Sequence, residues 1–399
     1  MAALEARAAA QPGRGGGARR VHARGRGRVL GGLREGAMGL VLEGVTKRIG
    51  ARTHLHPVDL SLAAGSLTVL LGQTLAGKTS LMRLMAGLDV PSEGRVRTGG
   101  RDVTGWPVRR RNVAMVYQQF INYPSLTVFE NIASPLRVAR LPRAEIETRV
   151  REAARLLRLD PYLQRRPLEL SGGQQQRTAI ARALVKRADL VLMDEPLANL
   201  DYKLREELRE ELPRIFAATG AIFVYATTEP AEALLLGGHT ATLHQGRVTQ
   251  FGPTAEVYRR PDDLVTARVF SDPPLNTLAG TKTGGRVALA TGGQARAAGP
   301  LAAVPDGPYT LAIRAHHLSL DPLGPEAITV PASVEVAEIT GSESFVHVAA
   351  GEHRFVVQRP GVRRLEPGTA VSVHLDPHHL LLFDEAGRRA AATPAQAAA

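Results

Sequence analysis

The sequence of 399 residues contains no cysteine. This absence excludes disulfide bonds, thiolate metal sites and a thiol nucleophile, and it fits a reducing compartment. No apolar run approaches the roughly 18 residues needed to span a bilayer. The first residues also lack the apolar core of a signal peptide. We therefore expect a cytosolic globular protein, long enough for two domains, that reaches a membrane only through a partner.

Acidic residues are in the minority, and the formal net charge is +12. Residues 1–37 hold eight Arg and two Glu, so this leader carries 8 − 2 = +6, half of the excess. Its Arg, Gly and Ala cannot build a core, and we expect it to be disordered. It could be a tail that binds RNA or a membrane surface. We favour an upstream extension of no consequence, because sequence typical of ordered structure begins just after Met38.

A glycine-rich segment at residues 72–79 has the pattern G-x-x-x-x-G-K-T. It follows an apolar run that predicts a buried strand at 67–71 and precedes residues 80–88, whose apolar positions recur at helical spacing. This is the setting of a phosphate-binding loop, in which backbone N–H groups and a helix N-terminus face phosphate oxygens. Lys78 would reach the β- and γ-phosphates, and Thr79 would ligate Mg²⁺. The candidate nucleotide-binding residues are Gly72, Gln73, Thr74, Leu75, Ala76, Gly77, Lys78, Thr79 and Ser80.

Strands and helices alternate up to about residue 275, which predicts a parallel sheet with helices on both faces. A turn is expected at residues 91–94. Further strands are expected at 39–45, at 58–62 with Pro57 at its entrance, and at 112–117, 190–193 and 221–225. Helices are expected at 127–139, 143–158, 172–186, 202–218 and 229–236.

Beyond residue 275 the helical periodicity fades, and short strands with turn signals predict a small all-β barrel or sandwich. The strands are expected at 287–290, 309–313, 332–339, 345–348, 354–358 and 370–375. The expected organisation is therefore a leader at 1–37, a domain at 38–275, a β domain at 276–388 and a disordered tail at 389–399.

The apolar strand at 190–193 ends in two acids, Asp194 and Glu195. In a protein with a phosphate-binding loop, Asp194 would hold Mg²⁺, here through water, and Glu195 would orient and polarise the attacking water. Alone, such a strand end could simply begin a loop. The phosphate loop upstream makes the catalytic interpretation the stronger one.

The sequence L-S-G-G-Q at residues 170–174 precedes a predicted helix. Its glycines permit close backbone approach, and its N–H groups would form a second anion site. Taken alone it could be an ordinary capped helix start, with Ser171 as the N-cap. The residues in question are Ser171, Gly172, Gly173 and Gln174.

Taken in order, five features resemble the nucleotide-binding subunit of an ATP-binding cassette (ABC) transporter. They are the phosphate loop, Gln118, L-S-G-G-Q, L-V-L-M-D-E-P and A-N-L-D at residues 198–201. The resemblance covers roughly residues 39–385 and includes the ATPases of carbohydrate importers, of the maltose and glycerol-phosphate type. It rests there on residues 246–261, 313–318 and 375–384. The strings T-L-A-G-K-T-S and A-T-T-E-P also resemble ATPases of bacterial glycerol or related polyol importers.

The resemblance implies an α/β P-loop ATPase with a helical subdomain at about 119–175, followed by an all-β, OB-like C-terminal domain. It implies ATP and Mg²⁺ as ligands, with Gln118 at the metal and beside the catalytic Glu195. It also implies a head-to-tail pair of ATPase subunits, two transmembrane permease subunits and, indirectly, an extracytoplasmic solute-binding protein. The chain would then lie on the cytoplasmic face of the inner membrane. Phe120, Tyr123 and Pro124 would contact the permease, unless they are core residues.

Two positions depart from the family pattern. Thr228 occupies the place where the family usually has a histidine that reaches the γ-phosphate. Threonine is shorter and cannot carry charge, and loss of such a hydrogen bond could slow turnover by about 10²–10³. Ile49 occupies the place of an aromatic residue that stacks on adenine, at a cost of about 1 kcal/mol in affinity. His54 or His56 could substitute for the missing ring, or both could be loop residues. Both departures fall in the chain's own nucleotide site, whereas L-S-G-G-Q is intact, so we expect a heterodimer with a different ATPase rather than a homodimer.

Three functions remain open from the sequence. The leading one is an energy-coupling ATPase for import of a sugar, glycerol or related polyol. The second is an ATP-binding regulatory subunit with impaired hydrolysis, paired with a different, competent ATPase, which Thr228 and Ile49 favour and Glu195 opposes. The third, an ATPase acting on nucleic acid, rests only on the basic leader, and we expect no nucleic-acid partner.

The histidine pairs 316–317 and 378–379 are not expected to bind metal, because neighbours on a strand point to opposite faces.

Overall fold

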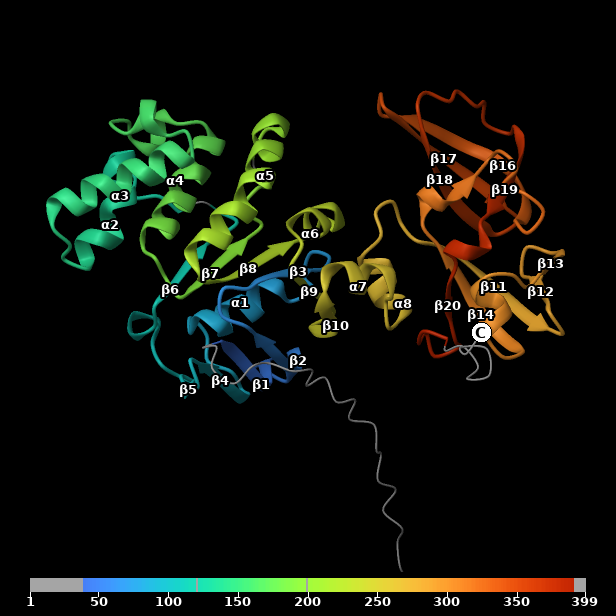
Figure 1. The fold of residues 1–399 in the computed structure, drawn as a ribbon, viewed down its shortest axis with the longest axis horizontal. Helices are drawn as coiled ribbons and strands as arrows, with labels where there is room; N and C mark the ends of the chain where they lie inside the picture. Colours follow the sequence, from blue (N-terminus) through green and yellow to red (C-terminus); the bar gives the residue numbers. More distant parts are fainter. Residues whose placement is uncertain (1–38, 120, 199, 391–399) are drawn as a thin grey trace, which may run out of the picture. The chain divides into compact units, whose positions relative to one another are not determined.

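The computed structural model describes residues 39–119, 121–198 and 200–390, except the side chains of Leu204 and Ala218 (Figure 1). The leader, Phe120, Asn199 and the tail from residue 391 lie outside the described residues. The expected tail began at 389, but the Arg389 N–H donates to Asp262 O and the Ala390 N–H to Leu382 O, both at 2.8 Å. The first two residues of the expected tail are therefore hydrogen-bonded to the preceding chain.

A four-stranded antiparallel sheet in the order β2-β1-β4-β5 opens the described chain. The strands are β1 Leu40–Ile49, β2 Arg52–Leu62, β4 Glu93–Thr98 and β5 Arg101–Asp102. The sequence predicted only a turn at the start of β4, because that strand is polar and buries one apolar residue, Val96. Pro57 lies inside β2 rather than at its entrance, which is tolerated because β2 is an edge strand.

The central sheet has the order β10-β9-β3-β8-β7-β6 and is parallel except for the β9–β10 hairpin (Figure 1). The strands are β3 Leu67–Leu71, β6 Val113–Val116, β7 Leu190–Asp194, β8 Ile222–Thr227, β9 His239–His244 and β10 Arg247–Pro253. The sequence did not predict β9 and β10. In β9, Thr240 and Thr242 occupy buried positions at which apolar residues would have indicated a strand.

Both faces of the central sheet are covered. In β3, Val69 and Leu71 pack into one hydrophobic core and Leu70 into another. Such two-sided burial explains the continuous apolar runs that predicted these strands. The helices are α1 Lys78–Ala86, α5 Tyr202–Thr219, α6 Pro230–Leu236, α7 Thr254–Arg259 and α8 Leu264–Val269, with a 3-10 turn η1 Val108–Arg110.

A helical region lies between β6 and β7. It contains α2 Val128–Val138, α3 Arg143–Leu156, α4 Gly172–Val185 and the 3-10 turns η2 Asp160–Tyr162 and η3 Pro167–Glu169. Thr127 caps α2 in a reciprocal pair with Glu130. The buried Asn131 accepts a hydrogen bond from Tyr123 N and donates to Tyr123 O and Leu126 O at 2.8–3.1 Å. This side chain therefore fixes the loop that enters α2.

The C-terminal region is all β apart from short helical turns, as predicted, and its two five-stranded sheets share one core. One sheet is β13-β12-β11-β14-β20 and the other β15-β19-β16-β17-β18. The strands are β11 Asn276–Thr283, β12 Arg286–Leu289, β13 Gln294–Arg296, β14 Gly307–Ile313, β15 Leu318–Ser319, β16 Ile328–Ile339, β17 Glu343–Ala350, β18 His353–Pro360, β19 Ala370–Leu375 and β20 Leu381–Phe383. The helical turns are α9 Pro300–Ala303, η4 Ala315–His317 and η5 Pro377–His379. Among the described residues, no helix is both long and apolar enough to cross a bilayer.

Candidate functional site

The phosphate loop connects β3 to α1, as the sequence predicted. Gly77 has a φ of 104°, and a Cβ there would lie 2.7 Å from Leu55 Cδ2. A Cβ at Gly72 would lie 2.5 Å from Leu243 O. Only glycine fits at these two positions without displacing neighbouring chain.

Lys78 lies inside this loop and is only 5% exposed. Its Nζ donates to Gly72 O at 2.7 Å and Gln73 O at 3.2 Å, and it lies 3.4 Å from Glu195 Oε1. Burial lowers the pKa of Lys78, and the nearby Glu195 carboxylate opposes that shift. The loop thus surrounds a largely desolvated ammonium group, which suits the binding of a multiply charged anion.

Thr79 and Asp194 meet across the carboxyl ends of β3 and β7. Thr79 Oγ1 donates to Asp194 Oδ2 at 2.7 Å. Burial raises the pKa of Asp194, and the Thr79 hydrogen bond counteracts that rise. A hydroxyl and a carboxylate are hard oxygen donors, so they fit Mg²⁺. No group of three or more His, Cys, Asp or Glu in the described part of the chain could hold a metal alone, so phosphate and water oxygens would complete the coordination.

Glu195 is held from two sides. Gln118 Nε2 donates to Glu195 Oε2 at 2.9 Å, which joins residues 77 positions apart. Glu195 has a φ of +46°, which is unusual for a residue with a side chain, and its N–H donates to Ala226 O at 3.0 Å. A strained backbone maintained by its surroundings is typical of functional positions. The positive φ of Glu195 was not predicted from the sequence.

Thr228 is exposed on the loop between β8 and α6. Among the described residues, no recorded hydrogen bond involves its side chain. Its neighbour Thr227 is buried and donates to Glu232 Oε2 at 2.6 Å. Tyr225 OH donates to the same oxygen at 3.1 Å, and Arg209 pairs with the other carboxylate oxygen at 3.1 Å.

We call Arg209, Tyr225, Thr227 and Glu232 the buried network. It fixes the entry of the loop that presents Thr228. Sequence reasoning missed this network, although Tyr225 and Thr227 at alternate strand positions share a face, which is a signal for a common partner.

Ser171 begins α4 as expected. It forms a reciprocal cap in which Gln174 N donates to Ser171 Oγ and Ser171 N to Gln174 Oε1. Ser171 and Gly172 are exposed, and Gly173 is partly buried. No hydrogen bond or ion pair among the described residues links this segment to the phosphate loop. The cap uses the N–H groups of Ser171 and Gln174, whereas those of Gly172 and Gly173 take no part in it.

The candidate adenine contacts lie on the first two strands, Ile49 on β1 and His54 and His56 on β2. Ile49 is 60% exposed, at the end of β1. The His54 Nε2 lies within hydrogen-bond distance of Ser80 Oγ, at 2.7 Å. His56 lies two residues further on β2, where its N–H donates to Gly246 O. Of the two histidines, His54 is thus the one that contacts the phosphate-loop segment through its side chain.

The predicted permease contact is exposed where it is described. Tyr123 is half-exposed with Arg182 over its ring at 5.2 Å, and Ile121 and Pro124 are also exposed. These residues are surface residues, so the alternative that they belong to the core is wrong for Tyr123 and Pro124.

The histidine pairs 316–317 and 378–379 are placed differently from the expectation, because both lie in 3-10 turns rather than on strands. His317 and His379 stack at 3.9 Å between ring centroids.

Two segments of the chain match known protein families. Residues 55–198 match the family model of the ABC transporter, and residues 311–383 match that of the TOBE domain. The chain is 36% identical to the sn-glycerol-3-phosphate import ATP-binding protein UgpC of Burkholderia ambifaria over 363 residues, covering 88% of this chain and 99% of the relative. The protein of the same name from Paracoccus denitrificans is also 36% identical, over 353 residues, covering 88% and 98%.

A solved structure shares the fold of the first domain. The ATP-binding cassette MJ0796, in a dimeric post-hydrolysis state bound to ADP and Pi, is 29% identical with a TM-score of 0.50. The match covers 54% of this chain and 98% of that one. The fold, the residues gathered around Lys78 and these relatives agree. The chain belongs to the ATP-binding subunits of ABC transporters, which are ATP hydrolases.

Proposed function

We propose that this chain is the ATP-hydrolysing subunit that powers import of a sugar, glycerol or related polyol through a separate membrane permease. Its relatives are named for the import of sn-glycerol 3-phosphate, so a polyol phosphate is the leading solute within this class. One observation carries the proposal. Lys78, Thr79, Gln118, Asp194 and Glu195 come from three separate segments and are joined by hydrogen bonds or an ion pair at one edge of the sheet.

In the proposed site, the backbone of residues 72–80 and the Lys78 ammonium group bind the phosphates of ATP. Thr79 and Asp194 hold Mg²⁺ with help from Gln118, and the ion neutralises phosphate charge when it is bound. Glu195 orients and polarises the attacking water. Gln118 holds Glu195 in position, and Thr228 replaces the family's histidine at the edge of the site. Ile49 and His54 would cover the adenine.

A second ATPase subunit would complete the site. In the proposed pair, Ser171, Gly172, Gly173 and Gln174 of one subunit face ATP held by the other. Exposure of this segment supports that arrangement. The exposed Ile121 and Tyr123 would contact the permease, which would hold the chain at the cytoplasmic face of the membrane. The pair could be a homodimer or a heterodimer with a different ATPase.

The test is ATP hydrolysis by the purified full-length chain, measured as phosphate release beside Glu195→Gln and Thr228→His. We expect wild type to hydrolyse ATP, Glu195→Gln to lose about 10²–10³ of the rate, and Thr228→His to change it little. Nucleotide binding by Glu195→Gln is the control for an intact pocket. A wild-type hydrolysis rate near background, together with a much higher rate in Thr228→His, would overturn the proposal. The chain would then be a hydrolysis-impaired subunit.

A further inference from the structure

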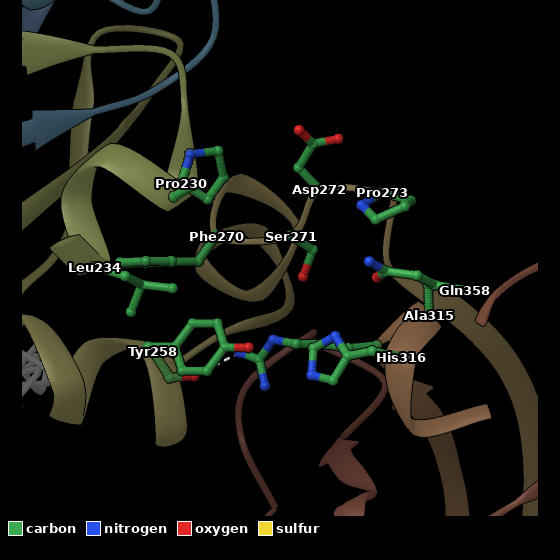
Figure 2. A pocket seen from close by; sticks show the side chains of 12 residues that line it. Pro230, Leu234, Tyr258, Phe270, Ser271, Asp272, Pro273, Ala315, His316 and Gln358 are labelled. Carbon is green, nitrogen blue, oxygen red and sulfur yellow. Dashed lines mark hydrogen bonds between the residues drawn. The ribbon is translucent and has the colours of Figure 1, made fainter. Parts of the chain in front are cut away.

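A cavity of about 220 Å³ is lined on one side by residues of α6, by Tyr258 of α7 and by residues 270–273. Residues 314–316 and Gln358 line it on the other side. Figure 2 shows Pro230 and Leu234 of α6 on one side of this cavity and Ala315 and Gln358 on the other. The ring of Tyr258 lies along its edge. The cavity involves none of the residues assigned above to ATP.

Arg314 lines this cavity and is only 8% exposed. Its guanidinium carbon lies 3.8 Å from the centroid of the Tyr258 ring, and Nη2 donates to Tyr258 O. Nε is buried with no acceptor. Burial lowers the pKa of Arg314, and no described carboxylate lies within ion-pair distance of it. A buried guanidinium that has only a ring and a carbonyl as partners lacks the counter-charge that such groups normally have.

The other lining groups suit a small anion. Asp272 is the single carboxylate that lines the cavity, and it is exposed and forms no recorded ion pair with Arg314. Ser271 and Gln358 provide neutral polar groups, while Leu234 provides an apolar wall. The planar fork of an arginine matches the two oxygens of a phosphate or carboxylate. The volume exceeds that of one such group, which leaves room for a short carbon skeleton.

We propose that this cavity is a binding site for a small molecule with a phosphate or carboxylate group, whose oxyanion pairs with Arg314. One wall belongs to α6, which begins two residues after Thr228 and carries Glu232 of the buried network. The ligand would therefore contact both the helix that follows the ATP site and the C-terminal domain. This second site is separate from the proposed ATP site and does not depend on hydrolysis.

The test is calorimetric titration of the full-length chain with inorganic phosphate, glycerol 3-phosphate and acetate. The Lys78→Ala variant serves as the background, so that anions bound in the phosphate loop do not contribute. We expect saturable binding of at least one of these probes. Arg314→Met keeps the apolar stem against Tyr258 and should weaken that binding about tenfold or more.

A matched control and a second variant keep the test decisive. Arg354→Met removes an exposed arginine paired with Glu335 and should leave binding unchanged. Ser271→Asp places a carboxylate in the cavity and should abolish binding without removing Arg314. Tighter binding of glycerol 3-phosphate than of phosphate, weakened by Leu234→Ala, assigns the site to a phosphate ester. No saturable binding of any probe, or equal binding by folded Arg314→Met, overturns the proposal.

Discussion

Glu232 offers a sharp test of the buried network, because a second carboxylate pairs with the same arginine from a different environment. The Glu232 side chain is 6% exposed, whereas that of Glu229 is 42% exposed, and both pair with Arg209. We compare Glu232→Gln with Glu229→Gln, which are the same chemical change. The side-chain amide in Glu232→Gln is uncharged and cannot form an ion pair with Arg209. In either orientation of the amide, its NH₂ group faces another hydrogen-bond donor, which is the Arg209 guanidinium or the hydroxyls of Tyr225 and Thr227.

The expected loss follows from these contacts. Loss of one partner of a buried ion pair typically costs about 3–5 kcal/mol, and a hydrogen bond to a charged group contributes about 1.5–3 kcal/mol. Arg209 keeps Glu206 and Glu229 as partners, so we expect Glu232→Gln to lower the free energy of unfolding by about 2–4 kcal/mol. This corresponds to a fall in Tm of roughly 4–16 °C. The exposed Glu229→Gln should lose less than about 1 kcal/mol.

Urea unfolding followed by far-UV circular dichroism measures both variants. The fluorescence of Trp106, the single tryptophan, provides a second probe within the ATPase domain. Equal losses of unfolding free energy in the two variants, or a loss below about 1 kcal/mol in Glu232→Gln, would refute the reasoning. Burial would then not be what makes the Glu232 carboxylate important for stability.

Three further predictions concern single positions. Gly77→Ala forces a Cβ against Leu55 at a positive φ, so nucleotide binding measured by titration should fall by about tenfold or more; unchanged binding would contradict the tight loop. Ser171→Ala removes the N-cap of α4 and should lower the free energy of unfolding by about 1 kcal/mol, while Ser171→Asp, which can also cap, should retain it. Burial and neighbouring cations lower the pKa of His317 to about 4, so the folded state resists its protonation. The stability of the C-terminal domain should therefore be unaffected above the unfolded pKa near 6.5 and fall by about 1–2 kcal/mol as the pH drops toward 5. A flat pH profile in urea unfolding would contradict this sign.

The phosphate loop and the cap at Ser171 could be predicted from sequence, because each is a local motif whose backbone geometry depends on adjacent residues. The buried parallel strands were equally visible, since two covered faces require continuous apolar runs. The strand β4 was missed because its residues are polar and only Val96 is buried. The strand β9 was missed because its buried Thr240 and Thr242 occupy positions where apolar residues are expected, and they form hydrogen bonds with Thr254 and Thr249. The buried network and Arg314 depend on residues brought together from distant segments, which no local pattern encodes.

Hydrogen bonds hold Gln118 and the described residues 121–127 to neighbouring elements. At one end Gln118 is bonded to the carboxylate of Glu195, and at the other Asn131 holds Tyr123 and Leu126. Asn122 is bonded in between to Gln175 O of α4. These hydrogen bonds connect the catalytic carboxylate, α2 and α4 to one exposed surface. We therefore expect a movement of Glu195 relative to α2 to displace the exposed Ile121 and Tyr123.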